Sequence, residues 1–282
     1  MEFDFVGIVG SGIMGSGIAE TTIESGYKVV LLSRTPESAK MMVETIKASF
    51  KKKIDRGNKT EDQSLEDLDR LSVTNEIAAL SNCDLVIETV VEDLEVKLRV
   101  MRSLDTVCKP STILATNTST FPVVELAAAT NRAGQVCGIH FFNPATVMKL
   151  IEIVRTLVVS EETIQRVCAF ALSCKKDAVV VKDQAGFVVN ALLFPYLNNA
   201  IKLLERGVAT KDDIDTAMKG GCGFPMGPFA LLDLIGLDTA LSILNSLYGE
   251  FKDPNYAPAP LLKRMVSAGM YGRKNKVGFY NY

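Results

Sequence analysis

His140 is the only histidine among the 282 residues, so any chemistry that requires an imidazole must use it. It ends the apolar run VCGIH, and Glu152 follows within a second apolar run, LIEIV. A carboxylate in so apolar a strand needs a polar partner, and a histidine provides one. Such a pair would fix the tautomer of the imidazole, which suits a general base. A lone histidine beside two phenylalanines is more often a core residue, but its place at a strand end favours catalysis.

The segment IVGSGIMGSG contains Gly10, Gly12 and Gly15 in the spacing G-x-G-x-x-G. An apolar run precedes the glycines and a helical pattern follows them, as in turns that bind a dinucleotide pyrophosphate. The first glycine allows a tight turn, the second lets the backbone approach the phosphates, and the third lets the helix pack on the strand. We therefore predict that these glycines, with Ile13 and Met14 between them, bind a dinucleotide. The alternative is a tight turn without a ligand.

The next apolar run, VVLL, ends in Ser33 and Arg34. Dinucleotide-binding turns usually have an acidic residue here, about 20 residues after the glycines, which binds the ribose 2′-hydroxyl of NAD. A hydroxyl and a guanidinium can instead bind the 2′-phosphate of NADP, for which arginine is well suited. We predict that NADP(H) is preferred and that NAD(H) remains possible. In the alternative, Arg34 stacks on the adenine and NAD still serves.

Short β-branched runs alternate with stretches of helical pattern in the first half of the chain. The runs occupy residues 4–10, 28–32, 84–89, 112–116 and 135–140. This alternation predicts parallel strands joined by right-handed crossovers in a doubly wound sheet. Residues 36–70 are longer and charged, and we expect a helix pair that extends from the sheet.

The pattern becomes helical from Gly186 onward, after a predicted hinge that begins at Asp183. The expected fold class is therefore α/β, with a Rossmann-type doubly wound sheet followed by an all-helical domain. We place the dinucleotide-binding domain at residues 1–184 and a helical domain for substrate and dimerisation at residues 185–282. Because the second domain has apolar helices, we expect it to pair with another copy in a homodimer.

Composition limits the classes of function. The formal net charge is −2 at pH 7, so no overall positive field would attract nucleic acid or an anionic membrane. The six cysteines include no C-x-x-C pair, and with a single histidine we predict no metal site. We expect reduced cysteines in the core of a cytoplasmic protein. The N-terminus lacks the basic region of a signal peptide, and no stretch is uninterrupted enough to predict a membrane span.

Five motifs together resemble the short-chain L-3-hydroxyacyl-CoA dehydrogenase family, most closely its bacterial members that act on the 3-hydroxybutyryl group. The motifs are GSGIMGSGIAE, ATNTST, GIHFFNPATVMKLIEIV, GFVVN and FPMGP. The resemblance covers essentially the whole chain in the family's order, and the block from HFFNP to the glutamate is its most specific part. It implies reversible conversion of acetoacetyl-CoA, a 3-oxoacyl-CoA, to (S)-3-hydroxybutyryl-CoA with a nicotinamide cofactor.

The resemblance also implies roles for individual residues. His140 matches the family's catalytic base and Glu152 matches its partner. Ser119 and Asn190 match the residues that hydrogen-bond the reacting oxygen, where uncharged donors stabilise developing negative charge. The further positions that match cofactor contacts are Glu92, Lys97, Asn117, Asn143 and Lys274. Lys274 would reach the cofactor from near the C-terminus, either within its own chain or from the other chain of a dimer.

A basic helical face is expected in the charged segment. Ser49, Lys52, Lys53 and Arg56 recur at spacings of three and four residues, so they share one face of a helix. Such a face can bind the phosphates of coenzyme A, and Ser49 matches a family position that contacts this group. The alternative is a solvated charged face.

Two other functions remain open. A free hydroxy-acid dehydrogenase of the same family, of the L-gulonate dehydrogenase type, has a similar HFFNP block but does not need the basic face that contains Ser49. A non-catalytic NADP-binding or structural protein does not need a histidine, two hydrogen-bond donors and a paired carboxylate together. A dehydrogenase of the 6-phosphogluconate type is disfavoured, because Gly186 occupies the place of its catalytic lysine, four residues before Asn190.

Overall fold

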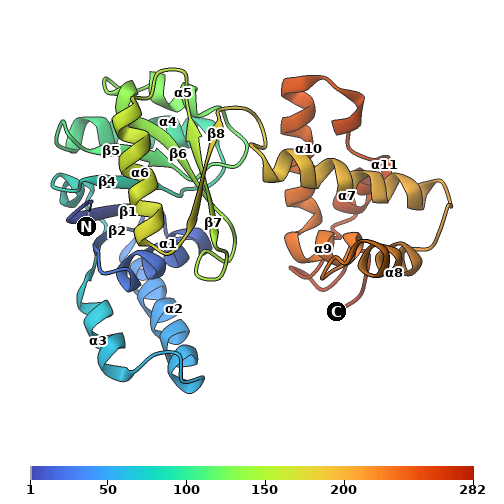
Figure 1. The fold of residues 1–282 in the computed structure, drawn as a ribbon, viewed down its shortest axis with the longest axis horizontal. Helices are drawn as coiled ribbons and strands as arrows, with labels where there is room; N and C mark the ends of the chain where they lie inside the picture. Colours follow the sequence, from blue (N-terminus) through green and yellow to red (C-terminus); the bar gives the residue numbers. More distant parts are fainter. Residues whose placement is uncertain (1) are drawn as a thin grey trace. The chain divides into compact units, whose positions relative to one another are not determined.

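The computed structural model describes residues 2–282 as two compact units, the first ending at Asp183 and the second running from Gln184 to Tyr282 (Figure 1). The first unit contains one sheet covered by helices, and the second is built from helices. The predicted fold class, a Rossmann-type sheet followed by a helical domain, is confirmed.

Eight strands form the sheet of the first unit, in the order β3-β2-β1-β4-β5-β6-β7-β8. The strands are β1 (Phe5–Val9), β2 (Lys28–Leu32), β3 (Leu71–Thr74), β4 (Leu85–Glu88), β5 (Ile113–Thr116), β6 (Val136–Phe141), β7 (Leu150–Arg155) and β8 (Asp177–Lys182). Strand order reverses between β1 and β4, and open sheets of this kind bind ligands beyond the carboxyl ends of their strands at that point. The glycine turn follows β1, so it lies at this edge.

The pairing of β7 with β6 is antiparallel, whereas every other neighbouring pair in the sheet is parallel. Only residues 142–149 connect the two strands, and a parallel connection needs a crossover of a dozen or more residues. The antiparallel register sets His140 directly opposite Glu152. A short connection thus brings the two predicted catalytic side chains together.

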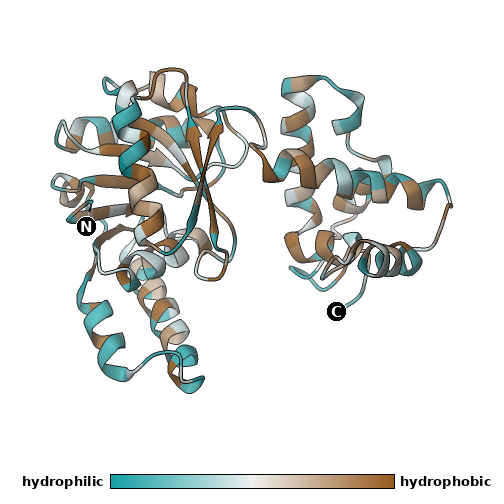
Figure 2. Ribbon diagram, viewed as in Figure 1, coloured by the Kyte–Doolittle hydropathy of each residue, from teal (hydrophilic) through white to brown (hydrophobic). Residues whose placement is uncertain are grey.

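Helices cover both faces of the sheet. They are α1 (Ile13–Glu24), α2 (Pro36–Asp55), α3 (Glu61–Asp69), α4 (Leu94–Val107), α5 (Val123–Ala128) and α6 (Glu161–Ser173), with 3-10 turns η1 (Ile77–Leu80) and η2 (Ala133–Gln135). One apolar core joins the sheet to α1, α2 and α6, and another joins it to α4 and α5. The sheet is mostly brown in Figure 2, as expected for strands buried on both faces, whereas α3 is mostly hydrophilic. The expected helix pair is α2 and α3, which extends from the sheet (Figure 1).

Six helical segments form the second unit around its own apolar core. They are α7 (Val189–Glu205), α8 (Lys211–Cys222), α9 (Pro228–Ile235), α10 (Leu237–Phe251), η3 (Pro254–Tyr256) and α11 (Pro260–Ser267). The buried carboxylate of Asp233 accepts hydrogen bonds from the backbone of Phe279 and Tyr280, which anchors the C-terminal segment. Within residues 2–282, no single helix is long and apolar enough to cross a membrane; α9 and α10 qualify only as a pair bent by 95°.

The cysteines are free thiols among the described residues. Cys83, Cys108, Cys137 and Cys174 are buried, as expected, and burial raises the pKa of the Cys137 thiol to about 12. The expectation of a core position is wrong for Cys222, which is exposed at the end of α8.

Candidate active site

His140 and Glu152 form a buried hydrogen-bonded pair at the carboxyl edge of the sheet. Nδ1 of His140 lies 2.8 Å from Oε2 of Glu152, and the two residues are 6% and 1% exposed. With the carboxylate ionised, Nδ1 carries the hydrogen and donates it, so Nε2 is the nitrogen with acceptor character. The ring of Phe142 packs at 4.5 Å from the imidazole, between centroids. The pair has the orientation that a general base requires.

The loop after β5 carries Ser119 to the same edge. Thr116, the last residue of β5, pairs with Gly138 of β6, two residues before His140. The loop is tied to β6 because Asn117 Oδ1 accepts a hydrogen bond of 2.9 Å from the backbone of Phe141. Ser119 therefore follows a strand end that lies beside the one carrying His140. The side chain of Asn117, predicted to contact the cofactor, is engaged with the protein backbone.

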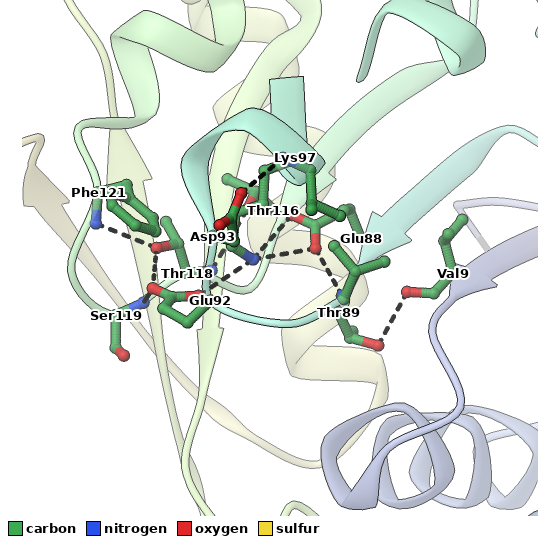
Figure 3. Close-up of polar contacts among 12 residues, drawn as sticks. Val9, Glu88, Thr89, Glu92, Asp93, Lys97, Thr116, Thr118, Ser119 and Phe121 are labelled. Atoms are coloured by element: carbon green, nitrogen blue, oxygen red, sulfur yellow. Dashed lines mark hydrogen bonds and ion pairs between the residues drawn. The ribbon is translucent and has the colours of Figure 1, made fainter. Parts of the chain in front are cut away.

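The carboxylate of Glu92 accepts hydrogen bonds from several residues of this loop (Figure 3). Its Oε1 accepts from the hydroxyls of Thr118 (2.5 Å) and Thr120 (2.7 Å) and from the backbone N–H of Ser119 (3.2 Å). Its Oε2 lies 3.1 Å from Nζ of Lys97. Burial would raise the pKa of Glu92, but the Lys97 charge and the hydroxyl donors outweigh it and lower that pKa. Figure 3 shows the Ser119 hydroxyl directed away from this carboxylate.

Lys97 itself is only 1% exposed on α4. Its ammonium lies 3.0 and 3.1 Å from the two oxygens of Glu88, a fully buried residue that was not among the predicted site residues. A direct contact of Lys97 with a cofactor stays a prediction. The signal for Glu88 was available, because it is a carboxylate in the apolar run LVIE and so needs a buried partner.

The glycine turn has the shape that a dinucleotide requires. Gly10 has a φ of 127°, and an added Cβ would lie 2.6 Å from Oγ1 of Thr89. A Cβ at Gly15 would lie 2.2 Å from the carbonyl oxygen of Gly10, so both positions exclude a side chain. At Gly12, in contrast, a Cβ would meet none of the described atoms within 4 Å. Space thus remains where phosphates would approach the backbone.

The start of α1 also fits an anionic ligand. Among residues 2–282, no side chain caps this helix at Gly12, and its first turn contains no acidic residue. Its first N–H groups and the positive end of its dipole therefore suit a pyrophosphate. Ile13 and Met14 open this helix, and Ile13 is 78% exposed.

Ser33 and Arg34 have different surroundings at the end of β2. Ser33 is 2% exposed, and its hydroxyl contacts the hydroxyl of Ser38 and the carbonyl oxygen of Thr35. The expectation that Ser33 offers its hydroxyl to a phosphate is therefore not supported, because this hydroxyl organises the start of α2. Arg34 is exposed and keeps its guanidinium at the surface.

The predicted basic face of α2 is split by its contacts with α1. Ser49 donates a hydrogen bond of 2.6 Å to Glu20, and Nζ of Lys53 lies 2.8 Å from Glu20 and 2.6 Å from Glu24. These carboxylates compensate the charge of Lys53 and occupy the hydroxyl of Ser49, so neither residue presents a free group. Binding of coenzyme A by this face stays a prediction. Lys52 and Arg56 are exposed, and Arg56 lies just beyond the last turn of the helix.

Three further predicted residues have these positions. Asn143 is exposed after β6 and forms a cis peptide bond with Pro144. Asn190 is buried in the first turn of α7, within the second unit. Lys274, also in the second unit, contacts Asp238 at 2.7 Å. The roles of Asn190 and Lys274 at a site stay predictions. No group of metal-ligating side chains is present among residues 2–282.

Two family models together match nearly the whole chain. The model described as "3-hydroxyacyl-CoA dehydrogenase, NAD binding domain" matches residues 5–184, and the one described as "3-hydroxyacyl-CoA dehydrogenase, C-terminal domain" matches residues 186–282. The chain belongs to the 3-hydroxyacyl-CoA dehydrogenase family. It is thus a member of a pyridine-nucleotide oxidoreductase family, and the resemblance seen in its motifs is confirmed.

Individual relatives are similar over their full length. A "Probable 3-hydroxybutyryl-CoA dehydrogenase" of Bacillus subtilis is 42% identical over 282 residues, which cover 100% of this chain and 98% of the relative. A "3-hydroxybutyryl-CoA dehydrogenase" of Clostridioides difficile is 43% identical, with 98% of each chain covered. The crystal structure of (S)-3-hydroxybutyryl-CoA dehydrogenase from Ralstonia eutropha has a TM-score of 0.97 at 39% identity, with 99% of each chain covered.

Proposed function

We propose that this member of the 3-hydroxyacyl-CoA dehydrogenase family interconverts acetoacetyl-CoA and (S)-3-hydroxybutyryl-CoA with NADP(H) as its preferred cofactor. The observation that carries the reaction type is the 2.8 Å contact between His140 and Glu152 across two antiparallel strands. The relatives named above for the 3-hydroxybutyryl group support the substrate.

In this mechanism, His140 moves the proton of the reacting hydroxyl. When the alcohol is oxidised, Nε2 takes that proton, and the buried Glu152 carboxylate stabilises the imidazolium that forms. In the reverse direction, the imidazolium returns the proton to the oxygen. Ser119 donates a hydrogen bond to this oxygen, and a second donor role for Asn190 stays a prediction of the resemblance. A bound nicotinamide supplies the hydride exchange.

The preference for NADP(H) rests on the end of β2. Ser33 leaves this position without the carboxylate that would repel a 2′-phosphate, and the exposed guanidinium of Arg34 can bind that phosphate. Because the Ser33 hydroxyl is engaged with Ser38, the attraction is assigned to Arg34 alone.

For the coenzyme A end, we assign phosphate binding to Lys52 and Arg56, the exposed cations of the predicted face. Lys52→Met should raise KM for acetoacetyl-CoA severalfold with little change in kcat, since a remote charge contact contributes similarly to ground and transition states. Lys47→Met is the matched control, because Lys47 is exposed on α2 and pairs with Glu44.

The homodimer is assigned to the second unit. Apolar side chains are exposed on its helices and loops, and surfaces of this kind mark protein contacts when they are contiguous. They include Leu192 (72% exposed), Val208 (65%) and Leu234 (49%). Leu192→Asp should shift the protein toward monomer in sedimentation velocity, and an unchanged dimer would contradict this assignment.

The deciding experiment compares initial rates with acetoacetyl-CoA and free acetoacetate, each with NADPH and with NADH. We expect turnover of the CoA ester with kcat/KM at least about a hundredfold above acetoacetate, since the remote contacts are lost without the carrier. His140→Ala should abolish turnover. Equal rates with free acetoacetate would favour a free hydroxy-acid dehydrogenase, and activity that survives His140→Ala would refute the mechanism.

Arg34→Ala tests the cofactor preference separately. We expect kcat/KM for NADPH to fall about tenfold or more, because a charge-assisted contact to phosphate is lost, while the value for NADH stays nearly constant. A large NADH preference in both the wild type and Arg34→Ala would refute the assignment.

A further inference from the structure

Two oppositely charged side chains are buried together beneath the Ser119 loop. Glu88 is 0% exposed and Lys97 is 1% exposed. The Glu88 carboxylate accepts four hydrogen bonds, of which two come from Nζ of Lys97. The others come from the backbone of Val90 (2.6 Å) and the hydroxyl of Thr116 (2.7 Å). Every oxygen of this carboxylate is therefore engaged, and the donors belong to the segment after β4, the helix α4 and the end of β5.

Burial of this pair is not explained by stability alone. Desolvation of two charges largely cancels their attraction, and well-packed apolar residues often replace such a pair without loss of stability. The proposed proton transfer does not use either group. What Glu88 does provide is a fixed position for the Lys97 ammonium. That ammonium makes its third close contact with Glu92, at 3.1 Å.

Glu92 connects the fixed Lys97 ammonium to the loop that contains Ser119. One carboxylate oxygen faces Lys97, and the other accepts hydrogen bonds from Thr118 and Ser119 (Figure 3). The same oxygen accepts a hydrogen bond from the next residue, Thr120. Thr118 in turn accepts from the backbone N–H of Phe121 at 3.1 Å. The start of this loop is also held by Asn117, whose Oδ1 accepts from the backbone of Phe141. The three residues from Thr118 to Thr120, however, share one acceptor, the carboxylate of Glu92, which is itself about one-third exposed.

We propose that the buried Glu88–Lys97 pair is a positioning element that fixes Glu92 and, through it, the loop that presents Ser119. Neither Glu88 nor Lys97 needs to touch the substrate for this role. The inference rests on the proposed function, because it assigns the loop's geometry to the step in which Ser119 binds the reacting oxygen. Misplacement of such a donor by about 1 Å can slow a reaction by about a hundredfold.

The test uses Lys97→Met and the double variant Glu88→Gln/Lys97→Met. Lys97→Met leaves two carboxylates close together without their cation, so its Tm should fall. The double variant removes the second buried charge and should recover most of that Tm. If the pair positions the loop, kcat with acetoacetyl-CoA should nevertheless stay about tenfold to a hundredfold below wild type, with KM within about threefold.

The matched control is Asp105→Asn, at the other end of α4. Asp105 is half-buried and pairs with Arg132 at 2.7 Å, remote in sequence from the loop's contacts. This variant should lose Tm but keep kcat. A double variant with wild-type kcat would overturn the proposal. A kcat that falls in parallel with Tm in every variant, including Asp105→Asn, would overturn it as well.

Amide hydrogen exchange separates this inference from the proposed function. The N–H groups of Ser119 and Phe121 should exchange about tenfold faster in the double variant, because their acceptors lose their anchor, and should not change in Asp105→Asn. Unchanged exchange in the double variant would overturn the positioning role. A wild-type protein that reduces no 3-oxoacyl-CoA would refute the proposed function, while the exchange rates would still decide whether the pair holds the loop.

Discussion

Replacing Glu152 by glutamine removes one charge from the proposed acid–base pair and keeps its size. Glu152 is 1% exposed and lies 2.8 Å from His140, so little solvent can compensate the imidazolium once the carboxylate is lost. Leaving one member of a buried ion pair unpaired costs about 3–5 kcal/mol. At about 1.4 kcal/mol per tenfold change, that range corresponds to a decrease in kcat of about 10²–10⁴. Glutamine can also hold the wrong tautomer, which acts in the same direction.

The assay follows oxidation of the reduced nicotinamide by acetoacetyl-CoA under saturating conditions. KM should change by less than about threefold, because Glu152 acts through His140 and does not bind the substrate. Glu161→Gln is the control, since this carboxylate is 62% exposed at the start of α6 and pairs with Arg155. A Glu152→Gln enzyme with kcat within about threefold of wild type would refute the assignment of His140 as the base.

Three further predictions concern the cofactor turn, the cofactor preference and a structural ion pair. Gly12→Ala should leave Tm nearly unchanged in a thermal melt, because an added Cβ meets no described atom within 4 Å, yet should weaken cofactor binding about tenfold or more in a titration. Ser33→Asp should lower the ratio of kcat/KM for NADPH over NADH at least about tenfold, since a carboxylate would repel the 2′-phosphate; a retained ratio would contradict this reasoning. Burial opposes ionisation of Asp105, but hydrogen bonds from Asn131 and Arg132 outweigh it and lower its pKa. This group therefore stabilises the fold above its unfolded pKa of about 3.9. The free energy of unfolding of wild type should exceed that of Asp105→Asn at higher pH, and this difference should shrink as pH falls from about 5 through the lowered pKa. Chemical unfolding of both proteins across this pH range measures the difference.

Hydrophobic patterning was sufficient to predict most of the sheet, because buried parallel strands are continuous apolar runs between helical stretches. The runs before Gly10 and Ser33 form β1 and β2 as expected. The antiparallel direction of β7 was not predicted, although the signal was present in the length of residues 142–149. That segment is too short for a crossover, so a hairpin was the physically available connection.

The site was predictable where one residue type demands a partner of a particular kind. Glu152 required a polar partner, and His140 was the natural choice. The contacts of Ser33 and Lys53 were not predictable in the same way. Ser33 turns toward Ser38 of the next helix, and Lys53 contacts a carboxylate 29 residues earlier in the chain, on α1. The partner of a polar side chain depends on how neighbouring helices pack against each other. The spacing of residues along a single helix does not predict that packing.

Glu88 and Glu152 are both buried carboxylates that need a polar partner, but their partners have different roles. The partner of Glu152 must gain and lose a proton in each turnover, so the carboxylate has to remain charged for the reaction. The partner of Glu88 is a lysine whose charge the proposed reaction does not change. Removing both charges of Glu88 and Lys97 can therefore preserve the fold while it releases the loop, whereas no apolar replacement of His140 and Glu152 can preserve the reaction. Stability and turnover should separate at one pair and not at the other.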